Sequence, residues 1–405
     1  MKSKLYLQWR SLEWISLLGD SLYYLALLSY ASKLSNPSLA VMIVSISETI
    51  PNFFQILLGV LADSTRQRTK RFFQSGIVRG MIYVIIGLII MFTDSIYAIF
   101  FIGILNSVSD LFGRYVSLCI DPFIKFIVSE ENLEKALSIN FVVRSSISMF
   151  ANFLGVILIS IVGIFQLAFI NAATFFIVSI GINVIHPKLE KIELEIESQK
   201  YNSVKDVLSY VISSLKKLLE IKKMRTLFII AAGLNSVAIT IVPISTIALS
   251  YNSEYTIINI SFSIAMIQAL IMVSGIVGSW VGADYLKKIP TKTLLFTSFL
   301  GNLLYVAMLF IDQLWLGVVV LLMSIFTTSI FNLRFSSEII KSTSAEQMGT
   351  IYACMDSFFL VVPSIISMIF MGIANISLVC YIFVIAIFCL LYMLFILTKE
   401  KSVYF

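Results

Sequence analysis

Seven ionisable side chains interrupt apolar runs that are long enough to cross a membrane. They are Asp20, Glu48, Arg79, Asp110, Arg114, Arg144 and Asp356. A charge in the hydrocarbon costs roughly 2.5–3.5 kcal/mol even on the insertion scale, so each of these residues requires a partner or a function. All except Asp356 lie in the first half of the chain, and we therefore expect ion coupling to reside there.

Asp20 and Glu48 are the two acids best suited to carry protons. Pro51 follows Glu48 by three residues and frees backbone groups, which favours a kink or a hydrated pocket around this carboxylate. The alternative is structural: Asp20 hydrogen-bonded to Ser16 or Ser21, and Glu48 paired with a neighbouring Ser or Arg. Glu48 is also a candidate for binding a cationic substrate.

Asp110 and Arg114 are spaced i,i+4, so on a helix they share a face and are expected to neutralise each other. Asp110 is the third candidate for proton coupling. Arg79 and Arg144 are expected either to extend to the membrane surface or pair structurally, or to belong to an inner gate.

The composition predicts elements that hold these charges inside a membrane. Hydrophobic residues make up 59% of the 405 residues and charged residues 13%, and the mean hydropathy is +0.96. A span needs about 20 apolar residues, so twelve spans with short loops use the whole length and exclude a soluble catalytic domain. The predicted spans are 12–34, 38–62, 73–92, 95–118, 136–162, 164–185, 224–250, 257–282, 292–311, 313–333, 347–370 and 374–398.

The basic residues predict the orientation of these spans. If both termini are cytoplasmic, 25 of the 29 Lys and Arg residues fall in inside segments, and only Lys33 lies in an outside loop. By the positive-inside rule, we expect a multi-pass protein of a bacterial cytoplasmic membrane with both termini inside. The run 12–34 is expected to be a first span and not a removable signal.

The longest polar stretch divides the chain into two groups of six spans. We expect an N-terminal bundle at 1–185, a cytoplasmic linker at 186–223 and a C-terminal bundle at 224–405. Within the linker, 204–219 has the spacing of an amphipathic helix on the membrane face, and 188–197 is expected to be solvated. Short echoes between the halves, such as GVLAD (59–63) with WVGAD (280–284), indicate two parallel six-helix repeats.

Other kinds of site have little support. The cysteines lack a CxxC pair, and His186 is the single histidine, so we predict neither a metal site nor a cofactor. The basic residues flank apolar runs, where they contact lipid headgroups, and nucleic-acid binding is not expected. No GxxxxGK[ST] phosphate loop exists for an ATP-driven pump.

Four segments resemble the major facilitator superfamily, and within it the macrolide-efflux and enterobactin-exporter-like branch. They are SLLGDSLYYLAL (16–27), GVLADSTRQRTKR (59–71), FIVSEENLEKALSINFVVRS (126–145) and EQMGTIYACMDS (346–357). The resemblance implies an all-α integral membrane protein with twelve transmembrane helices in two six-helix pseudo-repeats. It also implies that spans 1, 4, 7 and 10 line a central pathway.

The resemblance assigns a cytoplasmic gate to Gly59, Asp63 and Arg68. In this family the acid at the position of Asp63 lies near the N-terminal end of span 11 in the outward-facing state. The wider gate set adds Arg79, Arg114, Arg144 and Asp356. Two departures stand out: Ser64, Arg66 and Gln67 replace the usual Arg, Gly and Arg, and Ala151-Asn152 replaces the Gly-Pro of the antiporter signature.

The pathway spans offer polar side chains for a substrate cavity. These are Tyr23, Tyr24, Asn106, Ser109, Asn235, Thr240, Ser324, Thr327 and Thr328. Acids and aromatics from the first half favour an amphipathic or cationic substrate over a multiply phosphorylated anion.

The leading hypothesis is a secondary transporter that exports a drug-like, macrolide-like or peptide-like compound in exchange for protons. An importer or lipid flippase of the same fold is the first alternative. The second is a membrane sensor or scaffold without transport activity, with the helix at 204–219 as its docking element.

Overall fold

The structure is a computed structural model. It describes residues 2–31, 34, 37–93, 95–196, 198, 206, 209–210, 212–213, 216, 220, 222–251, 253–257 and 260–399. All regular secondary structure in this part of the chain is helical, which is the arrangement that satisfies backbone hydrogen bonds within each apolar segment.

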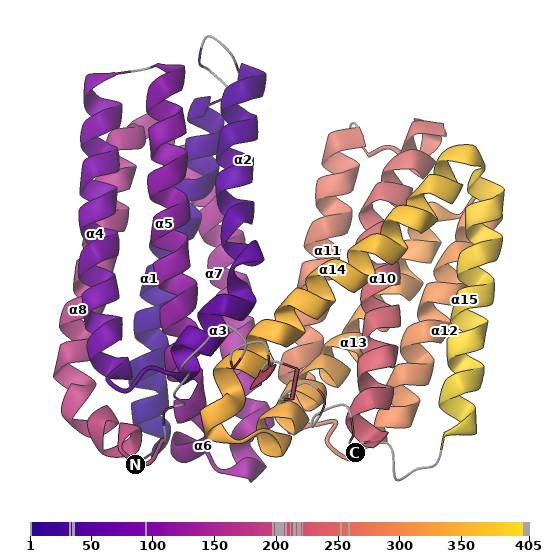
Figure 1. Ribbon diagram of the computed structural model, residues 1–405. Helices are drawn as coiled ribbons and strands as arrows, with labels where there is room; N and C mark the ends of the chain where they lie inside the picture. The colour runs from indigo at the N-terminus through magenta and orange to yellow at the C-terminus, as the bar shows by residue number, and fades with distance from the viewer. Residues whose placement is uncertain are drawn as a thin grey trace. The chain divides into compact units, whose positions relative to one another are not determined.

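Helices cover all of the predicted spans in the first half of the chain (Figure 1). They are α1 (Lys2–Ala31), α2 (Pro37–Phe53), α3 (Gln55–Asp63), α4 (Arg68–Phe92), α5 (Ile96–Ile120), η1 (Asp121–Phe123), α6 (Ile124–Ile127), η2 (Glu130–Asn132), α7 (Leu133–Ile161) and α8 (Ile164–Glu193).

Long helices also make up most of the second half of the chain. They are α10 (Lys222–Tyr251), η3 (Ser253–Tyr255), α11 (Ile260–Asp284), α12 (Thr291–Phe310), α13 (Leu314–Ser342), η4 (Ala345–Gln347), α14 (Met348–Ile376) and α15 (Leu378–Thr398). Among the described residues, nine helices are long and apolar enough to cross a membrane. The three remaining predicted spans coincide with α1, with α2 followed by α3, and with α7.

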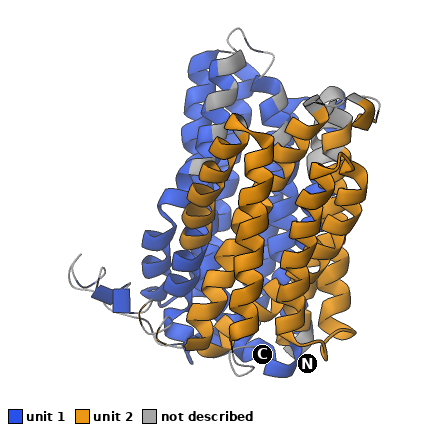
Figure 2. Ribbon diagram, turned by 90° about the vertical axis from the view of Figure 1, so that its right-hand side faces the viewer, with its two compact units in different colours: residues 1–132, 143–215, 343–357 blue, residues 133–142, 216–342, 358–405 orange. Residues whose placement is uncertain are grey.

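The chain divides into two compact units (Figure 2). Unit 1 contains Met1–Asn132, Val143–Leu215 and Thr343–Ser357, and unit 2 contains Leu133–Val142, Lys216–Ser342 and Phe358–Phe405. The first turns of α14 thus belong to unit 1, together with α1 to α5. This assignment places residues that are distant in sequence at one site.

One predicted boundary changes in the structure. Helix α8 continues through Pro187 to Glu193, so the first residues of the expected linker are helical, and Lys188, Glu190 and Lys191 among them are exposed. Most of the predicted amphipathic helix at 204–219 lies outside the described residues. The kink expected near Pro51 is confirmed, because α2 ends at Phe53 and α3 begins at Gln55.

Unit 1 is built around α8, which packs along α1 and α4, while α5 packs against α2, α3 and α4. Its core includes aromatic side chains that pack against one another: the Tyr23 and Tyr83 rings are 5.0 Å apart, edge to face, and the Phe175 ring lies 5.4 Å from that of Tyr83. These three residues are almost completely buried. The packing fixes the faces of α1, α4 and α8 that carry Asp20 and Arg79.

Unit 2 is held by contacts of α13 with α11 and α12 and by contacts of α12 with α15. Buried hydroxyls tie the helices together, including Ser245 with Tyr305 at 2.7 Å and Thr240 with Tyr381 at 2.8 Å. Helix α11 approaches α13 closely, because a Cβ at Gly278 would lie 2.5 Å from the backbone oxygen of Phe326. Small residues at such crossings let two membrane helices touch through their backbones.

We predict that Gly278→Ala destabilises the protein by about 1–3 kcal/mol, because the added methyl group must displace backbone atoms of α13. Gly372→Ala is the matched control, since a Cβ at that helical position meets no atom within 4 Å. Thermal unfolding of the purified protein in detergent measures both. Equal melting temperatures for the two variants would contradict the close approach.

Candidate functional site: a charged cavity and a capped helix in unit 1

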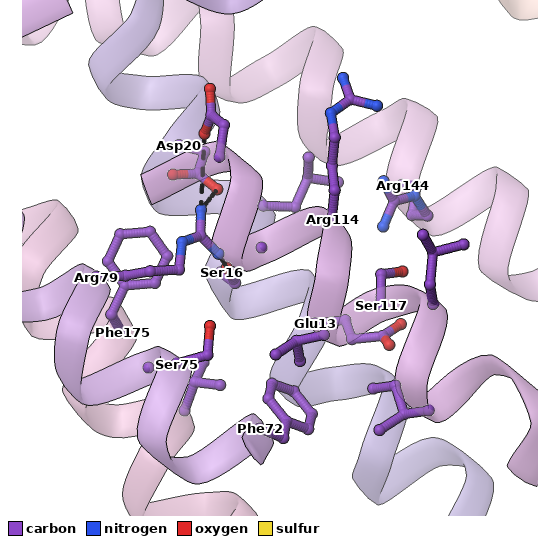
Figure 3. A pocket seen from close by; sticks show the side chains of 18 of the residues that line it. Glu13, Ser16, Asp20, Phe72, Ser75, Arg79, Arg114, Ser117, Arg144 and Phe175 are labelled. Atoms are coloured by element: carbon purple, nitrogen blue, oxygen red, sulfur yellow. Dashed lines mark hydrogen bonds and ion pairs between the residues drawn. The ribbon is translucent and has the colours of Figure 1, made fainter. Parts of the chain in front are cut away.

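A polar cavity of about 540 Å³ lies within unit 1 (Figure 3). Its walls come from α1 to α5 and α8, with Asp121 from η1, Arg144 from α7, and Tyr352 and Asp356 from the first turns of α14. The charged side chains of the lining are Glu13, Asp20, Glu48, Asp110, Asp121, Asp356, Arg79, Arg114 and Arg144. Six carboxyl groups therefore face three guanidinium groups, a formal excess of negative charge.

Arg79 on α4 is the centre of the charged residues in this cavity. Its guanidinium donates to Asp20 at 2.9 Å, to Ser109 at 3.1 Å and to Ser16 at 3.2 Å, and it lies 3.9 Å from the centre of the Phe175 ring. Only 8% of the residue is exposed. Arg79 is therefore a structural ion-pair partner and does not extend to the membrane surface.

Asp20 is an ion-paired acid, and its partner Arg79 was not among the partners that the sequence suggested for it, which were Ser16 and Ser21. Besides Arg79, it accepts a hydrogen bond from Asn171 Nδ2 on α8 at 3.3 Å. The partner was missed because it lies 59 residues away in the sequence. A search within one helical turn of Asp20 could not find it.

Asp110 also pairs with Arg79, at 3.9 Å, and not with Arg114 as the i,i+4 spacing predicted. Among the described residues, Arg114 has no ion pair within 4.0 Å; its side chain lines the cavity. Figure 3 shows Arg114 apart from the pair formed by Arg79 and Asp20. The shared helix face places Asp110 and Arg114 near one another, but Arg79 from α4 offers Asp110 the closer cation.

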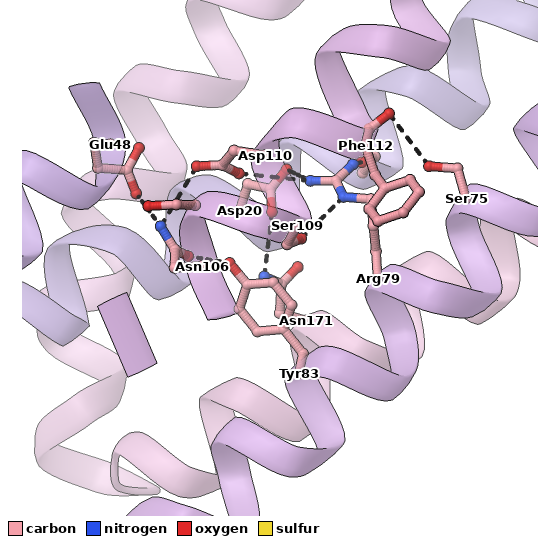
Figure 4. A network of polar contacts seen from close by, with 12 residues as sticks. Asp20, Glu48, Ser75, Arg79, Tyr83, Asn106, Ser109, Asp110, Phe112 and Asn171 are labelled. Carbon is pink, nitrogen blue, oxygen red and sulfur yellow. Dashed lines mark hydrogen bonds and ion pairs between the residues drawn. The ribbon is translucent and has the colours of Figure 1, made fainter. Parts of the chain in front are cut away.

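Asn106 connects the remaining acids (Figure 4). Its side-chain amide donates to Glu48 at 2.9 Å and to Asp110 at 3.4 Å, while its oxygen accepts from Tyr83 at 2.7 Å. Glu48 has no ion pair within 4.0 Å in the part of the chain that the structure describes. We call Asp20, Glu48, Arg79, Asn106 and Asp110 the acid–arginine cluster.

A second group of charges, not anticipated from the sequence, forms one end of the cavity. Arg10 contacts Glu13 at 2.5 Å and Asp121 at 3.5 Å, and its guanidinium lies 4.1 Å from the Trp9 ring centre. Asp356 accepts a hydrogen bond from Gln55 at 2.5 Å. Arg10 compensates one of the two charges of Glu13 and Asp121, so negative charge is in excess at this end of the cavity as well as in the acid–arginine cluster.

The expected contact between Asp63 and the start of span 11 is present. Asp63, at the end of α3, accepts the backbone N–H of Gly349 at 2.9 Å and that of Thr350 at 2.8 Å. These are the second and third residues of α14, so Asp63 caps this helix and opposes the positive end of its dipole. A Cβ at Gly59 would lie 2.7 Å from the oxygen of Gly349, so a glycine is needed at this crossing.

Two further residues hold this region, and neither was a sequence-based candidate. The Tyr210 hydroxyl donates to Asp63 at 3.4 Å and to the backbone oxygen of Glu346 at 3.2 Å. Glu193, at the end of α8, accepts the backbone N–H groups of Arg68 and Thr69 and so caps α4. The charged residues that alternate with apolar ones in 188–197 were the available sequence signal for Glu193, but they do not identify the groups that it caps.

Arg68 is almost fully buried and donates to the backbone oxygen of Cys119 at 3.0 Å and to that of Asp63 at 3.5 Å. It therefore fixes the loop between α3 and α4 against α5. Arg68 lies in the segment for which the family resemblance implies a gate, and its contacts in this structure are with carbonyl groups.

The predicted cavity residues separate into two groups. Tyr23 and Tyr24 line the cavity, and Asn106 and Ser109 support it through Glu48 and Arg79. In unit 2, Thr240 and Ser324 are 0% exposed in this structure.

The unit 2 side chains hold helices together. Thr240 bonds to Tyr381, and Ser324 accepts from Asn302 at 2.9 Å. Thr327 shares a hydrogen bond with Ser298 at 2.8 Å, and Asn235 donates to the oxygen of Ala231. Thr328 is half-buried on α13. No group of three His, Cys, Asp or Glu side chains within the described residues is arranged to hold a metal ion.

The long apolar helices define an all-helical, multi-pass membrane protein, and unit 1 contains a polar cavity. The chain belongs to the Major Facilitator Superfamily, whose sequence profile matches residues 12–367. It is accordingly a secondary transporter of small molecules and not an enzyme. Among curated proteins, none matches the chain significantly.

Solved structures support the fold over the full length. A bacterial homologue of the iron transporter ferroportin, outward-facing, matches with a TM-score of 0.70 and 12% identity over 98% of this chain and 99% of that chain. The transporter FucP in the outward conformation gives 0.63 and 13%, covering 98% of each chain. The human organic anion transporter MFSD10 gives 0.63 and 13%, covering 98% of this chain and 99% of that chain.

We predict that Arg79→Gln destabilises the protein by about 3 kcal/mol. This is the low end for breaking a buried ion pair, because the Asp20 side chain keeps 30% of its surface exposed. Adding Asp20→Asn should restore part of the loss, since it removes the uncompensated charge. Melting temperatures of the two single variants and the double variant test this, with Lys70→Gln as the control for an exposed cation. Additive losses in the double variant would contradict the pairing.

Proposed function

We propose that the protein exports an amphipathic or cationic compound in exchange for protons, using the acid–arginine cluster as the coupling site. The observation that carries the proposal is a cluster of three carboxyl groups with one guanidinium: Asp20 and Asp110 pair with Arg79, and Glu48 is joined to Asp110 through the side-chain amide of Asn106. If all four groups are ionised, the cluster is formally negative by two charges. Binding of a proton or of a cation relieves this repulsion, so the two ligands compete.

Within the cluster, Glu48 and Asp110 are the proposed proton carriers and Asp20 is the structural acid. Asp20 has the 2.9 Å ion pair with Arg79 and a second hydrogen bond from Asn171. Glu48 and Asp110 instead share one amide group, and Asp110 is 3.9 Å from Arg79. Release or uptake of a proton at Glu48 or Asp110 therefore disturbs fewer strong contacts than it would at Asp20.

The acidic lining favours a cationic substrate over an anionic one, and Tyr24 adds an aromatic surface for its apolar part. The direction of transport rests on the resemblance to the macrolide-efflux and enterobactin-exporter-like branch. An orientation with both termini in the cytoplasm of a bacterial cell rests on the distribution of basic residues. In that orientation, Asp63 and the start of α14 form the cytoplasmic gate.

We predict that Glu48→Gln and Asp110→Asn each lower gradient-driven accumulation by about tenfold or more, because the variant side chain cannot carry the proton, while exchange without a gradient continues. Proteoliposomes with an imposed pH gradient measure this, with radiolabelled tetraphenylphosphonium and erythromycin as probes. Asp312→Asn, an exposed acid in a loop of unit 2, is the matched control.

Unchanged accumulation in Glu48→Gln, in Asp110→Asn and in the double variant would reject the coupling site. Absence of gradient-dependent transport of either probe by the wild-type protein would reject the proposed substrate class. The two failures are distinguishable because only the second occurs without any substitution.

For the gate, we predict that Asp63→Asn lowers turnover by about tenfold while the probe binds within about twofold of wild type. The amide loses the negative charge that opposes the α14 dipole, but the cavity lining is unchanged. Tyr210→Phe should have a smaller effect in the same direction, and Tyr285→Phe, an exposed tyrosine, serves as its control. A loss of affinity with normal turnover in Asp63→Asn would contradict the gate role.

A further inference from the structure

A second cavity of unit 1 has no part in the proposed transport cycle. It has a volume of about 810 Å³ and lies where the loop 64–67 meets α4 and α5. Its lining residues are Ser64, Thr65, Arg66, Gln67, Arg71, Gln74, Ser75, Ile77, Val78, Phe112 and Tyr115. None of these residues lines the charged cavity except Ser75.

The end of the cavity at the loop is cationic and rich in hydroxyl groups. Arg66 and Arg71 are both exposed, and within the described part of the chain neither has a carboxylate within 4.0 Å. Arg66 Nε donates to Ser198 at 3.2 Å, and Arg71 donates to Gln74 at 3.0 Å. The Thr65 hydroxyl donates to the backbone oxygen of Leu61 at 2.7 Å and lies 2.7 Å from the Tyr115 hydroxyl, so the two arginines are the groups that offer donors at this end.

The other end of the cavity is apolar. Ile77 and Val78 are six and seven residues beyond Arg71 on α4, roughly 9–10 Å at the 1.5 Å rise of an α-helix. Phe112, on the neighbouring α5, is 38% exposed and faces the same cavity. Arg71 precedes the predicted span at 73–92, while Ile77 and Val78 lie inside it, so the cavity extends from the headgroup level into the hydrocarbon.

We propose that this cavity binds an anionic phospholipid from the leaflet that faces the loop 64–67. The lipid phosphate lies between Arg66 and Arg71, and one acyl chain runs along Ile77, Val78 and Phe112. Guanidinium groups form strong charge-assisted hydrogen bonds with phosphate oxygens, and two uncompensated cations at the membrane surface attract such a headgroup.

The apolar end identifies the source of the phosphate. A free phosphate ion would use the arginines and leave the surface of Ile77, Val78 and Phe112 unoccupied, whereas a phospholipid covers both ends. The same loop joins Asp63, which caps α14, to Arg68, which contacts α5. An occupied site therefore fixes the loop that carries these residues.

Native mass spectrometry of the delipidated full-length protein in detergent tests the site, with phosphatidylglycerol as the probe and phosphatidylcholine as the neutral reference. We expect Arg66→Gln with Arg71→Gln to weaken phosphatidylglycerol binding about tenfold or more, and to leave the phosphatidylcholine level unchanged. Lys70→Gln is the matched control, because Lys70 is an exposed cation of the same helical turn that does not line the cavity. Its effect should stay within about twofold.

Two further measurements keep the proposal falsifiable if the double variant fails to fold. Ile77→Trp fills the apolar end and should also weaken phosphatidylglycerol binding, although both arginines remain. Inorganic phosphate at millimolar concentration should not displace the lipid from the wild-type protein. Equal binding by the arginine variant and Lys70→Gln, wild-type binding by Ile77→Trp, or displacement by inorganic phosphate would each overturn the lipid site.

Discussion

The ion pair between Arg79 and Asp20 is the interaction on which the charged cavity depends. A lone charge inside a membrane protein is unfavourable, and the three acids of the acid–arginine cluster need a cation among them. Arg79 meets this need from α4 while its plane rests on Phe175 of α8. Its position is in turn fixed by the aromatic core of Tyr23, Tyr83 and Phe175, so apolar packing and charge placement form one structural unit.

Carboxylates also organise the helix ends of unit 1. Asp63 caps α14 and Glu193 caps α4, in each case from a different helix. A helix N-terminus leaves N–H groups without partners, and a borrowed carboxylate satisfies them and complements the dipole. A cap of this kind connects two helices by hydrogen bonds that can break, because the capped helix keeps its own backbone hydrogen bonds when the carboxylate moves away. This property suits a protein that alternates between two states.

The apolar pattern predicted the helices well, because a long apolar run in a membrane forms a helix whichever individual residues it contains. It also located Pro51 as a break and, through the family resemblance, Asp63 at the start of α14. The prediction of side-chain partners failed where the partners depend on which faces of two helices meet. The i,i+4 spacing suggested Arg114 as the partner of Asp110, but Arg79 comes from another helix. The hydrogen-bond partners of Thr240 on α10 and of Ser324 on α13 were missed for the same reason, because they come from α15 and α12.

The position of Glu193 has a practical consequence for separating the two halves of the chain. Hydropathy alone would place a cut just after Ile185, where the apolar run ends. Such a fragment would lack the last two turns of α8 together with the carboxylate that satisfies Arg68 and Thr69 at the start of α4. Gln67, which precedes α4, provides no side-chain cap of its own. Co-expression of two half-proteins, or insertion of a reporter domain between them, therefore needs a junction downstream of Glu193.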